Sequence, residues 1–260
     1  MTFPSFSEFY RALHGYEPLP WQTRLAELAV TGQWPDLLDL PTGVGKTSCI
    51  EVALYALARN PAGSPRRILL VVDRRIVVDQ GADHARRIRA RLLEEQGGPL
   101  RQVRDSLIAL TSDRDADPFA VAVLRGGAPR DDDWARRPDQ AVIGVSTVDQ
   151  VGSRLLFRGY GISPKLASIQ AGLLGNDTLI LLDEVHLAVP FAETLRALRD
   201  RHLSNAPGLP SRFQVVEMSA TPGKAPASES SQALARTRFE LDAEDHAHPV
   251  VKQRVSASKP

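Results

Sequence analysis

Short runs of hydrophobic residues recur along the chain and are separated by longer polar or amphipathic stretches. The runs are apolar almost throughout rather than at alternate positions, which is typical of strands covered on both faces, as in a parallel sheet. The pattern predicts six strands, at residues 36–40, 67–72, 120–124, 141–145, 178–182 and 213–217.

The stretches between these strands show helical periodicity, with apolar residues three or four positions apart. We expect helices over 46–59, ending before Pro61, over 77–95, and after Pro190 with Leu195 on its inner side. Alternating strands and helices predict an α/β, doubly wound fold, with a mainly parallel sheet and helices on both faces.

Two segments lack this periodicity. Residues 131–139, DDDWARRPD, are polar and contain a proline, so we expect a surface loop. Residues 222–236 are rich in small residues, which predicts a flexible segment, and the tail that follows shows no clear final element.

The composition limits the possible functions but does not indicate one. The 260 residues carry a formal net charge of +1, so any contact with nucleic acid would use local patches rather than a global basic field. The single cysteine, Cys49, cannot form an internal disulfide, and the start MTFPSFSEFY does not resemble a signal peptide. These features predict a cytoplasmic protein.

The stretch LPTGVGKT, residues 40–47, nearly matches the phosphate-binding pattern G-x-x-x-x-G-K-[ST]. It lies between a predicted strand and a predicted helix, which is the context that the pattern requires. Backbone amides of a glycine-rich loop converge on an anion, the lysine reaches the β- and γ-phosphates, and the hydroxyl binds Mg²⁺. The predicted nucleotide-binding residues are Thr42, Gly43, Val44, Gly45, Lys46 and Thr47.

Leu40 stands where the pattern has its first glycine. It lies at the predicted strand end, upstream of the amides that hold phosphate, so we expect its side chain to leave binding intact. The other interpretation is an ordinary glycine-rich turn with a chance match, which the strand and helix on either side disfavour.

A second motif, NDTLILLDEVHLAVP, follows the pattern of a buried strand that ends in carboxylates. Doubly wound sheets bind ligands at the carboxyl ends of their strands. We expect Asp183 to hold Mg²⁺ together with Thr47, Glu184 to orient the attacking water, and His186 to sense the phosphate. The alternative is that Asp183 and Glu184 are only the acidic start of a solvated loop, and the upstream GKT disfavours this interpretation.

The stretch VVEMSATPG places Ser219 and Thr221 just after the last predicted strand. Their hydroxyls could bond to His186 or to the carboxylates and couple the nucleotide site to other parts of the chain. The tripeptide SAT is uninformative alone, and its position after a strand gives it weight.

Together PTGVGKT, DEVH and SAT resemble motifs I, II and III of a superfamily 2 helicase of the DEAD/DEAH-box kind. The resemblance implies the first RecA-like P-loop domain, with ATP and Mg²⁺ as cofactors, and such helicases carry a small residue rather than glycine at the place of Leu40. PLPWQTRL resembles the adenine-recognising glutamine motif and implicates Gln22, although an amphipathic helix with an incidental glutamine remains open.

Longer stretches narrow the resemblance. VVDRRIVVDQ at 71–80, LRGG at 124–127, STVDQVGSRLLFRGYG at 146–161 and AGLLGNDTLILLDEVHLA at 171–188 resemble the CRISPR-associated helicase-nuclease of type I systems, nearest the type I-U subtype. That resemblance implies ATP-driven movement on single-stranded DNA and recruitment by an RNA-guided CRISPR surveillance complex.

The same resemblance implies a set of nucleic-acid contacts. Two arginines would meet phosphates, two glycines would let the strand approach closely, and a hydroxyl and an amide would bond phosphate or sugar. A salt-bridged loop is the alternative for the arginines. These residues are Arg74, Arg75, Gly126, Gly127, Thr147 and Gln150.

Neither a second RecA-like domain, with its Q-x-x-R-x-G-R motif, nor a histidine–aspartate nuclease is recognisable in the sequence. We therefore expect an N-terminal segment at 1–33, a RecA-like domain at 34–222, and a flexible tail at 223–260 leading toward an absent second domain. Such a half motor would bind ATP and hydrolyse it weakly. A P-loop phosphotransferase, an RNA-remodelling ATPase and a docking module without turnover are the alternatives.

Overall fold

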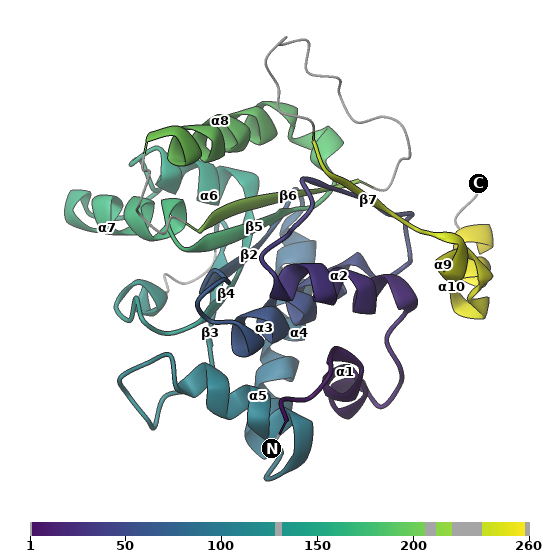
Figure 1. The fold of residues 1–260 in the computed structure, drawn as a ribbon. Helices are drawn as coiled ribbons and strands as arrows, with labels where there is room; N and C mark the ends of the chain where they lie inside the picture. Colours follow the sequence, from purple (N-terminus) through teal and green to yellow (C-terminus); the bar gives the residue numbers. More distant parts are fainter. Residues whose placement is uncertain (1, 128–131, 206–211, 220–235, 258–260) are drawn as a thin grey trace.

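A computed structural model describes residues 2–127, 132–205, 212–219 and 236–257 and contains a seven-stranded sheet (Figure 1). The strand order is β3-β4-β2-β5-β6-β1-β7, and every neighbouring pair is parallel. The predicted α/β fold and all six predicted strands are therefore confirmed. The strands are β1 (Leu37–Asp39), β2 (Arg67–Val72), β3 (Ala120–Leu124), β4 (Val142–Thr147), β5 (Thr178–Leu182), β6 (Phe213–Ser219) and β7 (Arg238–Glu240).

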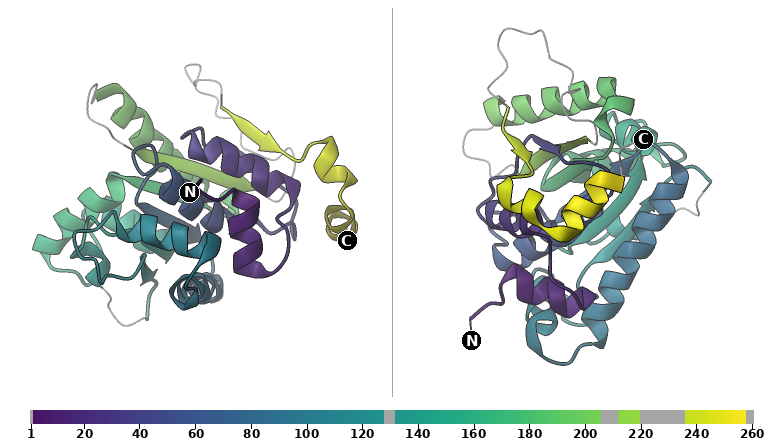
Figure 2. Two further views of the ribbon diagram at one scale, coloured as in Figure 1. Left: turned by 60° about the horizontal axis from the view of Figure 1, so that its bottom comes forward. Right: turned by 90° about the vertical axis from the view of Figure 1, so that its right-hand side faces the viewer.

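Helices cover both faces of the sheet, and the alternation of side chains along each strand feeds a separate core on each face. In β2, Ile68 and Leu70 join one core, whereas Leu69 and Val71 join the other. The first core is closed by α1 (Phe6–His14), α2 (Pro20–Val30), α3 (Cys49–Arg59), α4 (Arg75–Glu94) and α5 (Gly98–Ile108). The second is closed by α6 (Val148–Leu155), α7 (Pro164–Gly175) and α8 (Val189–Asn205) (Figures 1 and 2).

The three predicted helices are present. The first begins as the 3₁₀ turn η1 (Lys46–Ser48) and continues as α3, the second is α4, and the third is α8, whose Leu195 is buried. Within the described ranges no helix is both long enough and apolar enough to cross a membrane.

The predicted surface loop at 131–139 is more ordered than its polar sequence indicated. Its described part contains the 3₁₀ turn η2 (Asp133–Ala135), which buries Trp134 and Ala135 in the second core. Burial of the Trp134 indole fixes this segment, because the free energy gained by burying a large aromatic ring exceeds the cost of ordering the charged side chains beside it.

The C-terminal part differs from the expected flexible tail. Its described residues form β7, α9 (Ala243–Ala247) and α10 (Pro249–Ala257), which lie beside α2 (Figures 1 and 2). Arg24 of α2 holds this segment: its guanidinium lies 2.5 Å from Asp245 Oδ2 and 4.3 Å from the ring centroid of Phe239. Residues 220–235, which include most of the predicted flexible stretch, lie outside the described residues.

Candidate nucleotide and nucleic-acid sites

The loop between β1 and η1 contains two glycines in a conformation that other residues rarely adopt. Gly43 and Gly45 have φ values of 83° and 84°, in the left-handed region that only glycine enters without strain. Alternation of such residues with right-handed ones turns successive backbone amides toward a common point. The two glycines are therefore needed for the shape of the loop.

Leu40 explains the departure from the phosphate-binding pattern. Its side chain is fully buried in the first core, and its amide donates to the carbonyl of Ser219 on β6 at 3.2 Å. Leu40 is thus a continuation of the sheet rather than part of the loop, and a glycine there would only weaken the core.

The acidic motif follows β5 at the same edge of the sheet. The amide of Asp183 donates to the carbonyl of Val71 at 2.9 Å, and the amide of Glu184 donates to Asp183 Oδ1 at 3.1 Å. Glu184 has a φ of 48°, an uncommon conformation for a residue with a side chain. It begins the 3₁₀ turn η3 (Val185–Leu187).

Lys46 links the loop to these carboxylates. Its Nζ lies 3.9 Å from Glu184 Oε1 and donates to the carbonyl of Leu40 at 3.2 Å. Burial raises the pKa of Asp183, opposed by the charge of Lys46 and reinforced by that of Glu184. The desolvated carboxylate of Asp183 and the exposed hydroxyl of Thr47 follow strands at the same edge of the sheet, and both are oxygen ligands of the kind that Mg²⁺ takes from few protein groups before it completes its shell with phosphate and water.

His186 belongs to the same cluster, with its Nδ1 3.3 Å from Glu184 Oε2. Ser219 ends β6, the strand between β1 and β5, so it lies between the phosphate loop and the carboxylates. Thr221 lies outside the described residues.

Gln22 is bound into the phosphate loop. Its side-chain oxygen accepts from the amide of Leu19 at 2.7 Å, and its Nε2 donates to Ser48 Oγ at 2.7 Å. Ser48 Oγ in turn donates to the carbonyl of Gly45 at 2.7 Å. The glutamine is buried and links α2 to the phosphate loop, and its role in recognising adenine stays a prediction.

Arg254 is a contact that the sequence did not predict. From α10, its Nη1 donates to the carbonyl of Gly43 at 3.2 Å, across 211 positions of sequence. The same atom would lie 3.8 Å from a Cβ on Gly45. Arg238 of β7 forms an ion pair with the buried Asp39 just before the loop. No local pattern marks these arginines, so only the fold reveals them.

Four of the six predicted nucleic-acid contacts line one groove of about 700 Å³. They follow β2, β3 and β4, which form the half of the sheet beyond β5, so the groove lies at the same edge as the phosphate loop. Arg75 opens α4, and its Nη2 would lie 3.2 Å from a Cβ on Gly126. The four are Arg75, Gly126, Thr147 and Gln150.

The other two lie nearby without lining the groove: Arg74 is exposed at the start of α4, and Gly127 has a φ of 79°. Within the described ranges, neither Arg74 nor Arg75 lies within 4.0 Å of a carboxylate oxygen, and their contact with nucleic acid stays a prediction. Gln150 is partly engaged, since its Oε1 accepts from Arg154 Nη1 at 2.6 Å.

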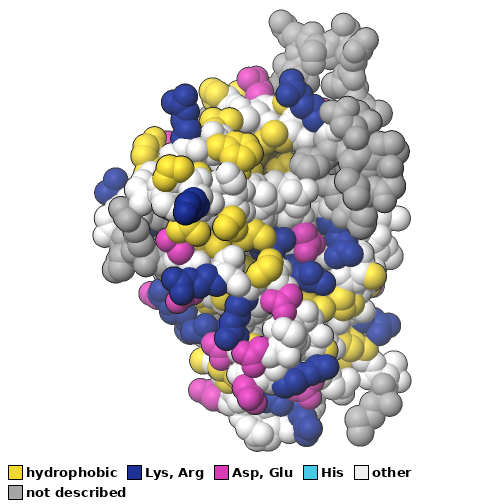
Figure 3. Space-filling model, turned by 90° about the vertical axis from the view of Figure 1, so that its left-hand side faces the viewer, with side chains coloured by type: hydrophobic (Ala, Val, Ile, Leu, Met, Phe, Trp, Pro, Cys, Tyr) yellow, Lys and Arg dark blue, Asp and Glu magenta, His cyan; other side chains and the backbone are white. Residues whose placement is uncertain are grey.

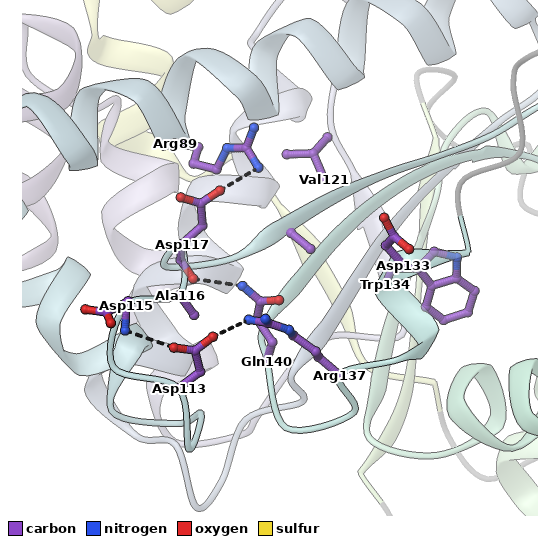
Figure 4. Close-up of a pocket in the computed structure, with 11 residues that line it drawn as sticks. Arg89, Asp113, Asp115, Ala116, Asp117, Val121, Asp133, Trp134, Arg137 and Gln140 are labelled. Atoms are coloured by element: carbon purple, nitrogen blue, oxygen red, sulfur yellow. Dashed lines mark hydrogen bonds and ion pairs between the residues drawn. The ribbon is translucent and has the colours of Figure 1, made fainter.

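A second cavity, of about 460 Å³, lies where β3 and β4 begin and hence at the opposite edge of the sheet (Figure 4). Its charged groups largely satisfy one another: Arg89 lies 3.1 Å from Asp117, and Arg137 lies 2.7 Å from Asp113. This pairing is typical of a surface hollow rather than a reactive site.

Two aspartates directly precede a histidine in the sequence, Asp83 before His84 and Asp245 before His246, and both aspartates form ion pairs with arginines. Asp83 accepts from Arg86 at 2.7 Å, and Asp245 is bound by Arg24. His84 Nε2 lies 2.9 Å from Glu51 Oε1, and His14 Nε2 lies 2.9 Å from the same oxygen. Hydrogen bonds from the two imidazoles lower the pKa of Glu51, although burial alone would raise it.

A parallel sheet with a phosphate loop after one strand and an acidic motif after another is the arrangement of a P-loop nucleotide-binding domain. The chain belongs to the family described as "Type III restriction enzyme, res subunit", which matches residues 16–224. Helicase ATPase domains of this kind generally use ATP and Mg²⁺ and bind nucleic acid.

Three solved structures resemble this chain, and the first of them, with a TM-score above 0.5, shares its fold. The yeast DEAD-box splicing factor Prp28 is 16% identical with a TM-score of 0.51, covering 99% of this chain and 48% of that one. The Pyrococcus furiosus Hef helicase domain is 22% identical with a TM-score of 0.48, covering 83% and 35%. T. fusca Cas3-AMPPNP is 18% identical with a TM-score of 0.47, covering 84% and 22%. The chain therefore spans less than half the length of these three structures, and no curated protein matches it.

Proposed function

We propose that this chain is the ATP-binding half of an ATP-dependent translocase or helicase that acts on single-stranded DNA. The observation that carries the proposal is the approach of the phosphate loop to the acidic motif, with Lys46 Nζ 3.9 Å from Glu184 Oε1. A lysine held between a phosphate loop and a carboxylate is suited to a triphosphate, whose charge it would neutralise.

In this proposal each residue has a defined role. Lys46 and the loop amides bind the β- and γ-phosphates, and Thr47 and Asp183 hold Mg²⁺. Glu184 orients the attacking water, with His186 bound to its other oxygen. When present, Mg²⁺ would neutralise charge that develops on the phosphates.

The groove beyond β5 supports the nucleic-acid part of the proposal. It unites Arg75, Gly126, Thr147 and Gln150, which are far apart in sequence. Competition between single-stranded DNA and RNA of the same sequence would separate a DNA motor from an RNA remodeller, because only RNA offers a 2′-hydroxyl.

The cellular role we propose is type I CRISPR interference, nearest the type I-U subtype, in the cytoplasm. The stretch STVDQVGSRLLFRGYG at 146–161 supports it by resemblance. The partners would be an RNA-guided surveillance complex, a second RecA-like domain and a nuclease domain. We propose that hydrolysis stays weak without that second domain, since ATPases of this class commonly need an arginine from it.

The test is titration with a fluorescent ATP analogue and Mg²⁺. Two charge-assisted bonds from Lys46 at about 2 kcal/mol each, less about 1 kcal/mol for the Leu40 carbonyl given up, predict a roughly 150-fold higher Kd for Lys46→Ala. Lys165→Ala, which removes an exposed charge of α7, is the matched control and should bind normally. Absence of saturable binding by the folded wild type would refute the proposal.

Hydrolysis is measured on the same material, with and without single-stranded DNA. We expect slow turnover in both conditions. Strong DNA-stimulated hydrolysis would contradict the dependence on a second domain while leaving the nucleotide site intact. Transfer of phosphate to a small molecule instead of water would establish a phosphotransferase, and unchanged nucleotide binding in Lys46→Ala would indicate a docking module.

A further inference from the structure

The turn between α6 and α7 exposes large apolar side chains that the proposed function has not used. Leu156, Phe157 and Tyr160 are 60%, 63% and 65% exposed, and Leu187 on η3 is 52% exposed. Figure 3 shows the side of the molecule from which α7 projects, where hydrophobic side chains gather among lysines and arginines. Clustered exposure of this kind is uncommon on a surface without a ligand.

The turn is held in one conformation rather than left loose. The amide of Phe157 donates to the carbonyl of Arg154 at 3.0 Å, and that of Arg158 donates to the carbonyl of Ser153 at 2.7 Å. Phe157 has a φ of 60°, a conformation that costs a bulky residue about 1 kcal/mol or more. The fold therefore keeps these apolar groups at the surface, although their exposure to water and the backbone conformation of Phe157 are both unfavourable.

Of these side chains, Tyr160 and Leu187 line the groove that holds four of the predicted nucleic-acid contacts. Tyr160, Leu187 and Phe191 form an apolar wall of that groove, and Arg75 lies on its polar side. The carboxylates of Asp73 and Asp149 also line the groove. Their negative charges do not suit a row of phosphates along its whole length. An uncharged planar group against the apolar wall, with a phosphate at Arg75, suits this mixture of surfaces.

We propose that Tyr160 is a base-stacking residue for single-stranded nucleic acid, with Leu187 packed against the same base. Every base has an apolar face that an exposed aromatic ring can cover, and single strands leave that face free. A duplex would present only its backbone and groove edges. The inference rests on the proposed function and adds to it the surface that holds the bases.

The test uses the full chain and a single-stranded oligonucleotide that contains 2-aminopurine, whose fluorescence falls when it stacks. Tyr160→Ala should bind about 5- to 100-fold more weakly and lose the quenching. Tyr160→Phe keeps the ring and should bind within about twofold of wild type. Tyr16→Ala, which removes a tyrosine that is 60% exposed and outside the groove, should bind normally.

Two outcomes overturn the inference. Wild-type affinity and quenching in Tyr160→Ala would show that the ring does not stack. Equal losses in Tyr160→Phe and Tyr160→Ala would assign the effect to the hydroxyl. The ATP-analogue affinity of Tyr160→Ala should equal that of wild type, which controls for folding and separates this test from the proposed function. If wild type binds the nucleotide but no single strand, this inference fails and the ATP site stands.

Discussion

Arg254 offers a sharp test of whether the C-terminal segment belongs to the nucleotide site. Its guanidinium donates to the carbonyl of Gly43 at 3.2 Å, and this glycine shapes the phosphate loop. A hydrogen bond from a charged donor contributes about 1.5 kcal/mol, and exposure of Arg254 lowers this to about 1 kcal/mol. Arg254→Ala should therefore raise the Kd for the Mg²⁺–ATP analogue about fivefold.

The assay is the same fluorescence titration, with two companion variants. Arg254→Lys can still donate one bond and should lie between wild type and Arg254→Ala. Lys252→Ala removes an exposed charge from the same helix and should bind normally. A loss above about 30-fold would mean that Arg254 contacts a phosphate directly, since one carbonyl bond cannot supply so much. A change below about twofold would refute the role of α10 in the site.

Two further predictions concern stability. Glu51→Gln should lower the free energy of unfolding by about 1–3 kcal/mol at about pH 7, since two imidazoles lose a charged buried acceptor. Because the folded-state pKa of Glu51 is lowered, its contribution is fully present above the unfolded pKa of about 4.3 and is lost as the pH falls through the folded-state pKa, so the deficit in denaturant titrations should shrink at acidic pH. The exposed Glu94→Gln is the control, and a deficit independent of pH would contradict the assignment. Gly45→Ala should cost about 1–2 kcal/mol through its φ of 84°, whereas Gly172→Ala, in mid-helix with no atom near its Cβ, should stabilise by about 0.5–1 kcal/mol. Equal changes in melting temperature for Gly45→Ala and Gly172→Ala would contradict backbone strain at position 45.

The central part of the fold could be predicted because its signals are local. Each strand from β1 to β6 contains a short apolar run, and the phosphate loop and the acidic motif directly follow two of these strands. In a parallel sheet the carboxyl ends of the strands share one edge, so the proximity of Lys46 and Glu184 could be predicted without knowledge of the tertiary packing.

The parts that escaped prediction depend on long-range contacts. β7 has only three residues, with Phe239 alone buried, and it is a strand because β1 offers it a free edge. The α9 segment is polar, and its Asp245 is buried only because Arg24, 221 positions earlier, pairs with it. The local sequence identifies neither β1 as the neighbour of β7 nor Arg24 as the partner of Asp245, so this segment resembled a flexible tail.

One short turn connects the two proposed sites. η3 follows Glu184, which faces Lys46, and ends at Leu187, which lines the same groove as Tyr160. Between them Val185 is buried in the second core, so the turn cannot flex freely at its centre. A displacement of Glu184 by a γ-phosphate would therefore be passed to the groove wall over three residues. Because such coupling is reciprocal in binding free energy, a single strand that shifts Leu187 must alter nucleotide affinity by the same factor.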